Sequence, residues 1–166
     1  NMAMDLKEKG IIDGIGMQSH LDTGFPTVAQ YEKALAKFAS TGLDVQVTEL
    51  DITTNDTSAA GFEKQAEIYS GILDACVKYA DSISAVIFWG TTDETSWRGD
   101  RCPLLFNGDY TAKPAYYAII DGIESTGTTT TTTTTTTDTT TTTTDTITTT
   151  DTTETTTDTT VTTTET

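Results

Sequence analysis

Two carboxylates stand at the end of the most strand-like segment of the sequence. Residues 45–52 read VQVTELDI, in which Glu49 and Asp51 follow β-branched residues. Parallel α/β folds place their chemistry at the carboxyl ends of strands, so an acid that emerges there from an apolar run is a candidate for catalysis. We identify Glu49 as the candidate catalytic residue. The alternative interpretation is that the two acids form a strand-end cap or a salt bridge.

Polar and aromatic side chains end two further strand-like segments. Side chains two apart on a strand share a face, which groups Gln18 with His20, Glu49 with Val45 and Val47, and Trp89 with Ala85 and Ile87. If the three strands are neighbours, four side chains converge at one rim: Gln18, His20, Glu49 and Trp89. There, Gln18 and His20 would hydrogen-bond the Glu49 carboxylate and hold it ionised for nucleophilic attack. The flat indole of Trp89 would offer a platform for a sugar ring.

Two of these residues also have ordinary structural explanations. A lone histidine at a strand end, such as His20, is more often a structural hydrogen-bonding group than a catalytic one. Trp89 alone suits a packed core. Metal binding is the weakest option, because a single histidine and scattered acids give no recognisable ligand spacing. We expect neither a metal nor a cofactor.

The loop that follows Trp89 holds a second tryptophan. Trp97 lies in the polar run SWRGD, where a large apolar ring has little reason to be unless something stacks on it. Arg98 beside it could bind a substrate hydroxyl, or it could pair with Asp93 or Glu94. We favour pairing from the residues alone, and keep Arg98 as a candidate substrate-binding residue.

Strand and helix patterns alternate along the chain and would position these side chains. Strands are predicted at 15–19, 45–52 and 83–89, and helices at 27–41, about 58–80 and 114–122, with a helix end at 1–9 closed by Gly10. This alternation indicates parallel strands with right-handed crossovers. A (β/α)₈ barrel takes about 250 residues. The predicted fold class is therefore α/β, the C-terminal half of a (β/α)₈ TIM barrel with about three βα units, plus a disordered Thr-rich tail.

Apolar stripes define the two longer helices. The first begins with a possible capping box from Thr27 to Gln30, and its stripe comprises Val28, Tyr31, Leu35 and Phe38 before Gly42 ends it. The second has Phe62, Ala66, Tyr69, Leu73, Cys76, Val77 and Ala80 on one side. We expect these stripes to pack against the strands.

Composition divides the chain into a predicted catalytic segment, residues 1–126, and a Thr-rich acidic linker, residues 127–166. Six acids of the linker account for the difference between the net charge of −16 for the whole chain and −10 for the remainder. An acidic protein argues against nucleic acid or an anionic membrane as a partner, and no apolar stretch is long enough to cross a bilayer. The linker is similar to O-glycosylated connectors of secreted proteins, so we expect an extracellular location.

Cysteine gives two alternatives. Cys76 and Cys102 could form one bridge in an oxidising compartment. Because Cys76 falls on the apolar side of a predicted helix, we favour an inert buried thiol there and a loop thiol at Cys102.

Four ordered motifs resemble glycoside hydrolase family 10, the retaining endo-β-1,4-xylanases. They are GIGMQSHL at 14–21, VTELDI at 47–52, FWGTTDETSWR at 88–98 and PLLFNGDYTAKPAYYAI at 103–119, and the resemblance covers residues 1 to about 124. It implies that Glu49 is the nucleophile, that Gln18 and His20 contact it and that Asp51 bonds the histidine. It also implies that Trp89 and Trp97 wall the sugar site.

The sequence departs from the family pattern in two places. The position expected to pair with Cys76, near Ser82, is not cysteine, so the family's disulfide is not expected. The family's acid/base glutamate follows an asparagine, and the chain contains no Asn-Glu pair. We therefore expect a secreted endo-1,4-β-xylanase whose acid/base lies in an N-terminal barrel half outside this chain, and an isolated chain with little or no activity.

The expected partners are xylan or xylo-oligosaccharide, the N-terminal barrel half, and a further module joined by the linker. Two other functions remain open from the sequence. One is a non-catalytic carbohydrate-binding or scaffolding fragment, which the missing acid favours and the set Gln18, His20, Glu49 and Asp51 disfavours. The other is a different barrel glycosidase such as a cellulase, which would not be expected to carry all four motifs.

Overall fold

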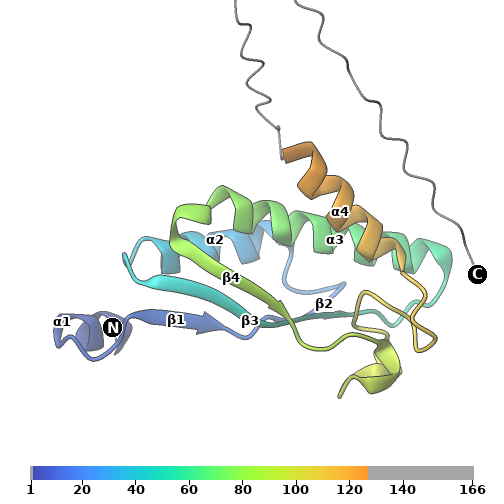
Figure 1. The fold of residues 1–166 in the computed structure, drawn as a ribbon, viewed down its shortest axis with the longest axis horizontal. Coiled ribbons are helices and arrows are strands. Elements are labelled where there is room, and N and C mark those ends of the chain that lie inside the picture. Colours follow the sequence, from blue (N-terminus) through green and yellow to red (C-terminus); the bar gives the residue numbers. More distant parts are fainter. Residues whose placement is uncertain (1, 127–166) are drawn as a thin grey trace, which may run out of the picture. The chain divides into compact units, whose positions relative to one another are not determined.

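The computed structural model describes residues 2–126, and the predicted linker lies outside them. The strands are β1 (Gly14–Met17), β2 (His20–Asp22), β3 (Asp44–Thr53) and β4 (Ile83–Phe88). The α-helices are α1 (Met2–Glu8), α2 (Val28–Ala39), α3 (Ala59–Lys78) and α4 (Pro114–Thr126). Three short 3₁₀ turns complete the order: η1 (Ala80–Ser82), η2 (Asp93–Thr95) and η3 (Gly99–Arg101). Figure 1 shows α2, α3 and α4 together on one side of the strands.

The strands form one parallel sheet with β3 at its centre. Val45 of β3 pairs with Ile15 of β1 and with Ile83 of β4, so these two strands lie on opposite edges of β3. Strand β2 continues the line of β1 along β3, with His20 opposite Asp51. The predicted parallel arrangement is therefore confirmed for residues 2–126.

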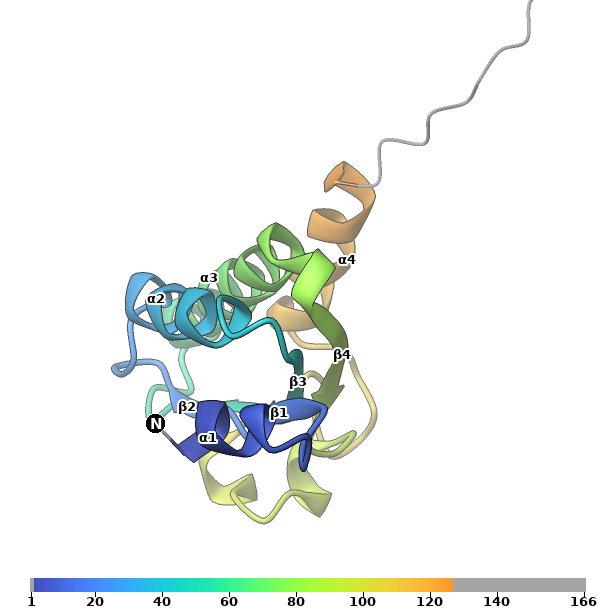
Figure 2. The same ribbon diagram turned by 90° about the vertical axis from the view of Figure 1, so that its left-hand side faces the viewer.

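Helices α2 and α3 cover one face of this sheet and form the hydrophobic core with it. The core includes Tyr31 and Leu35 of α2, Val47 and Leu50 of β3, and Tyr69 of α3. Figure 2, turned by 90°, shows both helices lying alongside the strands on the same side. Burial of these apolar side chains stabilises the strand ends that carry the polar residues, at about 25 cal/mol per Å² of apolar surface removed from water.

The local helix signals in the sequence are confirmed. Thr27 accepts a hydrogen bond from the Gln30 amide while the Gln30 side chain accepts one from the Thr27 amide, which is the predicted capping box. Helix α2 ends at Ala39, and Gly42 beyond it has a φ of +64°, which favours glycine.

The apolar stripe predicted for α3 was wrong at its C-terminal end, because Val77 is 50% exposed and Ala80 lies in η1. Ile72 and Ala75 are buried instead.

A β-bulge in β3 overturns the predicted face sharing of Glu49. Val47 pairs with Val86 and Leu50 with Phe88, so β3 has one more residue than β4 between these pairs. Val47 and Leu50 are both fully buried in the core although they are three residues apart. Glu49, next to Leu50, therefore points to the face opposite Val47, away from the helices.

The predicted strand at 15–19 is likewise interrupted. Ser19 has a φ of +70°, in the left-handed region, and separates β1 from β2. The Glu49 amide still donates to the Gln18 carbonyl, and the Asp51 amide to the Ser19 carbonyl. Met17 packs against the core and Ser19 Oγ contacts Tyr31 Oη of α2 at 2.8 Å, so the alternate positions Gln18 and His20 face away from the helices.

We predict that the 166-residue chain self-associates. Within residues 2–126, β1 and β4 each pair with β3 alone, and Ile87 on β4 is 46% exposed. Unpaired strand edges beside exposed apolar groups recruit further strands. Sedimentation velocity over a range of concentrations should show a rising sedimentation coefficient, and Ile87→Lys should reduce the rise. Val77→Lys, at an equally exposed position on α3, is the control, and a monomer at every concentration would contradict the prediction.

Candidate active site

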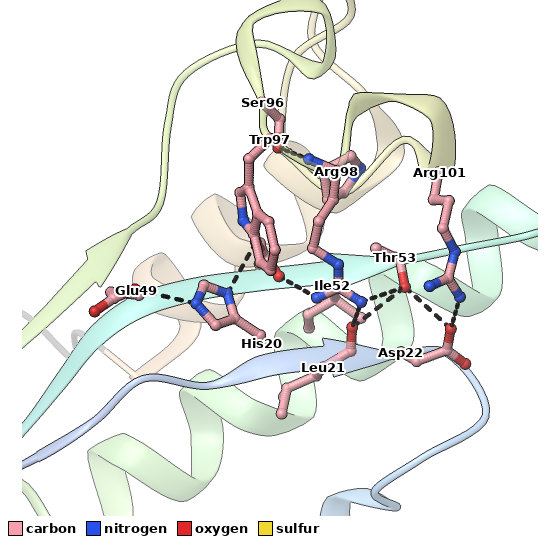
Figure 3. Close-up of polar contacts among 12 residues, drawn as sticks. His20, Leu21, Asp22, Glu49, Ile52, Thr53, Ser96, Trp97, Arg98 and Arg101 are labelled. Atoms are coloured by element: carbon pink, nitrogen blue, oxygen red, sulfur yellow. Dashed lines mark hydrogen bonds and ion pairs between the residues drawn. The ribbon is translucent and has the colours of Figure 1, made fainter.

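His20 lies between the two carboxylates that the sequence singled out. Its Nε2 is 3.0 Å from Glu49 Oε2, and its Nδ1 is 3.0 Å from Asp51 Oδ2. Figure 3 shows the imidazole of His20 on β2 facing Glu49 on the adjacent strand. The ring therefore fixes the orientation of the Glu49 side chain.

Asp51 is the centre of the hydrogen-bond network. It is fully buried, and its Oδ2 also accepts a hydrogen bond from Trp97 Nε1 at 3.0 Å. Its Oδ1 accepts one from Arg98 Nη1 at 2.6 Å. A buried carboxylate is costly unless it is paired and hydrogen-bonded. Asp51 meets this requirement with donors from Trp97 and Arg98 and a contact with His20 Nδ1, and it thereby fixes the three side chains together.

Glu49 is the accessible member of the set. Its side chain is 22% exposed, whereas that of Asp51 is 0% exposed. Within residues 2–126 only its Oε2 is hydrogen-bonded, to His20, which leaves Oε1 open to an approaching molecule. An oriented carboxylate with one free oxygen can act as a nucleophile toward an electrophilic carbon.

Two indoles stand beside the histidine. The rings of His20 and Trp97 have centroids 5.0 Å apart at 70°, and those of His20 and Trp89 are 6.4 Å apart at 69°. Trp97 is 66% exposed and Trp89 is 46% exposed, so the interpretation of Trp89 as a core residue is wrong. Exposed aromatic rings next to an oriented carboxylate are suited to stack on a sugar ring.

Arg98 pairs as the sequence favoured, but with a different acid. It contacts Asp51 instead of Asp93 or Glu94, and its Nη2 donates to the Leu21 carbonyl at 3.1 Å and to Thr53 Oγ1 at 3.0 Å. Figure 3 shows the guanidinium directed inward from the loop toward the ends of β2 and β3. Its side chain is 15% exposed. These contacts hold Arg98 within the protein, so they do not support direct substrate binding by this residue.

Gln18 differs from the expected arrangement. Its side chain is exposed, and within the described part of the chain it makes no hydrogen bond to Glu49. The contact between these residues runs through the backbone, from the Glu49 amide to the Gln18 carbonyl at 3.0 Å.

A second layer of polar contacts, which the sequence did not reveal, connects the site to the loop after β2. Thr53 Oγ1 donates to Asp22 Oδ2 at 3.0 Å, and Arg101 Nη2 donates to the same oxygen at 2.6 Å. Arg101 Nε also donates to Asn55 at 3.0 Å. No local pattern could have identified these pairs, because Asp22 and Arg101 are 79 residues apart.

Asp22 predicts a pH dependence of stability. Burial raises the pKa of its carboxyl, but hydrogen bonds from the Gly24 amide and Thr53, together with the charges of Arg101 and Arg98, outweigh burial and lower the pKa below 3.8. A group whose folded-state pKa is depressed stabilises the protein above its unfolded pKa, and this contribution is lost as pH falls through the folded value.

We therefore expect Asp22→Asn to lower the melting temperature at pH 6 and to flatten its decline below about pH 4. Thermal unfolding between pH 2 and pH 6, followed by circular dichroism, measures both effects. Asp81→Asn removes the same charge from an exposed site and serves as the control. A decline of the melting temperature with falling pH that is equally steep in the wild type and in Asp22→Asn would contradict the prediction.

Both cysteines are free thiols. Burial raises the pKa of Cys76 to about 11, so this thiol is a poor nucleophile at neutral pH, as the helix pattern predicted. The alternative Cys76–Cys102 bridge is wrong for this structure.

No cluster of three or more histidine, cysteine, aspartate or glutamate side chains in residues 2–126 could hold a metal ion. No helix in the same residues is long and apolar enough to cross a membrane.

Comparisons with known proteins agree on one family. The model of glycosyl hydrolase family 10 matches residues 1–122. Bifunctional endo-1,4-beta-xylanase XylA of Ruminococcus flavefaciens is 52% identical over 116 residues, covering 70% of this chain and 12% of that protein. Endo-1,4-beta-xylanase A of Thermotoga neapolitana is 39% identical over 132 residues, covering 72% and 12%.

A solved structure is similar in fold as well as in sequence. The intracellular xylanase TsXylA of Thermoanaerobacterium saccharolyticum, in a mutant complex with xylotetraose, superposes with a TM-score of 0.67 at 39% identity. The match covers 71% of this chain and 37% of that one. The chain thus spans little more than a third of a solved relative and about an eighth of the two xylanases above.

Proposed function

Because the chain belongs to glycosyl hydrolase family 10, we propose that it supplies the nucleophile side of a retaining endo-1,4-β-xylanase. One observation supports this most directly: Glu49 is held by His20, which is held in turn by the buried Asp51. The three side chains come from the adjacent parallel strands β2 and β3, next to the carboxyl ends of β1 and β4, and barrel enzymes place their chemistry at such strand ends. We further propose that these strands are part of a (β/α)₈ barrel.

In the proposed reaction, Glu49 attacks the anomeric carbon of a xylosyl unit. Retaining hydrolysis uses two carboxyl groups about 5–5.5 Å apart, one as nucleophile and one as acid and then base. Glu49 Oε1 would form the glycosyl ester, while the acid protonates the leaving oxygen. Water activated by the same second group would then release the sugar with its configuration retained. The second carboxyl group is proposed to come from residues outside this chain.

The local contacts would prepare Glu49 for this step. The contact of His20 with Oε2 leaves Oε1 as the attacking atom, and a hydrogen bond donated by the imidazole would also disperse charge on the carboxylate. Trp97 and Trp89 would stack on the sugar next to the bond that breaks. A group pre-oriented in this way lowers the entropic part of the barrier.

The experiment combines the 166-residue chain with a separately produced N-terminal part of a family 10 barrel. Hydrolysis of an aryl β-xylobioside and of an aryl β-cellobioside is then compared, because an activated leaving group reduces the need for the acid. Hydrolysis of the xylobioside that depends on both parts, with β-configured product by NMR, supports the proposal. Preference for the cellobioside would indicate a cellulase.

If neither glycoside is hydrolysed although the two parts are shown to associate, the result would favour the second candidate function, a carbohydrate-binding or scaffolding fragment. The exposed indoles are the observation that favours this candidate. Binding of xylohexaose without turnover, lost in Trp97→Ala, would establish it. Hydrolysis by the isolated chain would contradict the expectation that it is inactive alone.

A further inference from the structure

The loop that carries Trp97 and Arg98 needs an anchor. It runs from β4 to α4, and its only regular structure is the pair of short 3₁₀ turns η2 and η3. Such segments are ordinarily the most mobile part of a domain. Both of its functional side chains must nevertheless reach Asp51 within hydrogen-bond distance, at 3.0 Å for Trp97 and 2.6 Å for Arg98.

A buried ion pair lies behind this loop. Lys113, which is 2% exposed, directs its Nζ to Asp93 Oδ2 at 2.9 Å and to the Cys102 carbonyl at 2.8 Å. Asp93 Oδ1 accepts the Leu104 amide at 2.7 Å. Asp93 lies before Trp97 in the loop, and Cys102 and Leu104 lie after Arg98. The ion pair therefore fixes to each other the two ends of the loop segment that carries Trp97 and Arg98.

The same end of the loop is joined to β3. The Ile52 amide donates to the Pro103 carbonyl at 3.1 Å, and Tyr69 Oη donates to it at 2.6 Å. Gln65 Nε2 bridges the Ile52 and Cys102 carbonyls at 2.6 and 2.7 Å. Contacts from Lys113 and Asp93 thus continue, through this backbone segment, to the strand that carries Asp51.

The segment is also packed without spare room. A Cβ added at Gly99 would lie 2.2 Å from the Asp93 carbonyl oxygen. Asp93 and Gly99 are therefore in direct backbone contact, with Trp97 and Arg98 between them. A displacement of Asp93 would move Gly99 and with it the two side chains that reach the site.

We infer that Lys113 and Asp93 are positioning residues, whose buried pair holds the Trp97–Arg98 loop on Asp51. The pair makes no direct contact with the Glu49–His20–Asp51 set among the described residues. No local pattern indicated it, because Lys113, next to the start of α4, and Asp93 are 20 residues apart. Its consequence for hydrolysis rests on the proposed function. The position of the Trp97 indole does not, so the two can be tested separately.

The indole N–H of Trp97 provides the readout. The chain has two tryptophans, so Trp89→Phe leaves one indole signal in a ¹H–¹⁵N spectrum of the 166-residue chain. In this background, Lys113→Met and the neutral pair Asp93→Asn/Lys113→Met should shift the Trp97 signal toward that of free indole. We also expect its hydrogen exchange to be at least about ten-fold faster, because the bond to Asp51 opens.

Controls separate positioning from general folding. Lys113→Arg keeps the charge and should restore most of the indole protection, while Lys64→Met, at an exposed site of α3, should change nothing. An unchanged Trp97 signal in a folded neutral-pair variant would overturn the inference. The proposed xylanase activity could still stand after that result, since the readout requires no turnover.

Native-state exchange of the unmodified chain covers the case in which the methionine variants do not fold. We expect the Trp97 indole N–H and the Leu104 amide N–H, which donates to Asp93, to exchange through one opening step with the same denaturant dependence. Exchange of the indole while the Leu104 amide stays protected would overturn it, because the loop would then move with the ion pair intact.

Discussion

Replacement of Glu49 by glutamine is expected to abolish hydrolysis of an aryl β-xylobioside by the reassembled barrel. Loss of a nucleophile typically lowers kcat by about 10⁴-fold or more, and glutamine preserves the shape and the contact with His20 while removing the attacking charge. Steady-state kinetics with both parts at saturating concentration measure the effect. Glu49→Asp should retain more activity, because it keeps the charge but withdraws the oxygen, a displacement that costs about 10²-fold.

Two controls make the Glu49 result specific. Glu67→Gln removes a carboxylate from the exposed side of α3 and should leave kcat unchanged. Glu49→Ala opens space for azide, which should restore turnover and give a glycosyl azide of inverted configuration, because azide attacks in place of the carboxylate. Activity within ten-fold of the wild type in Glu49→Gln would exclude Glu49 as the nucleophile.

Replacement of Arg98 by methionine is expected to cost about 3–5 kcal/mol in the free energy of unfolding, because it leaves the buried Asp51 carboxylate without its cation. Asp51→Asn should also destabilise the chain, since an amide nitrogen would face the Arg98 donors. In the double variant neither charge remains. We expect its cost to fall short of the sum of the single costs by about 2 kcal/mol.

Urea unfolding of the four proteins at low concentration gives this double-mutant cycle. Arg101→Met is the control from the same loop: its pair with Asp22 is more exposed and should contribute no more than about 1 kcal/mol. Additive effects of Arg98→Met and Asp51→Asn would contradict the network described for Asp51. Such a result would return Arg98 to the role of a substrate-binding residue.

A substantial part of the site could be predicted from local patterns. The run VQVTELDI indicated a strand that delivers Glu49 and Asp51, and the His20 position two residues past Gln18 indicated a polar strand end. The structure brings His20, Glu49 and Asp51 together at 3.0 Å. Their convergence could be predicted from parallel pairing, because the strands of a parallel sheet end at the same edge.

Face assignments failed where the backbone is irregular. Strict alternation placed Glu49 with Val47, but the extra residue of the bulge reverses the alternation. The VTEL run does not signal this irregularity, because a bulge is specified by how two strands fit against each other.

The predicted ion-pair partner of Arg98 was wrong because its actual partner is distant in the sequence. Local proximity favoured Arg98 pairing with Asp93 or Glu94, whereas the structure pairs Arg98 with Asp51, 47 residues away, and Asp93 with Lys113. Buried charges must be compensated by whichever partner the packed loop brings near. Sequence spacing carries no information about that choice.

Local sequence patterns were enough to predict the order of strands and helices, the capping of α2, the delivery of Glu49 and Asp51 by one strand, and the family motifs. These depend on periodicity and on contacts within a few residues, which the chain encodes locally. The packed fold was needed to establish which face Glu49 occupies, which cation pairs with Asp51, and which acid pairs with Lys113. Those features depend on the fit between segments distant in sequence, and that fit exists only once the helices and strands have packed.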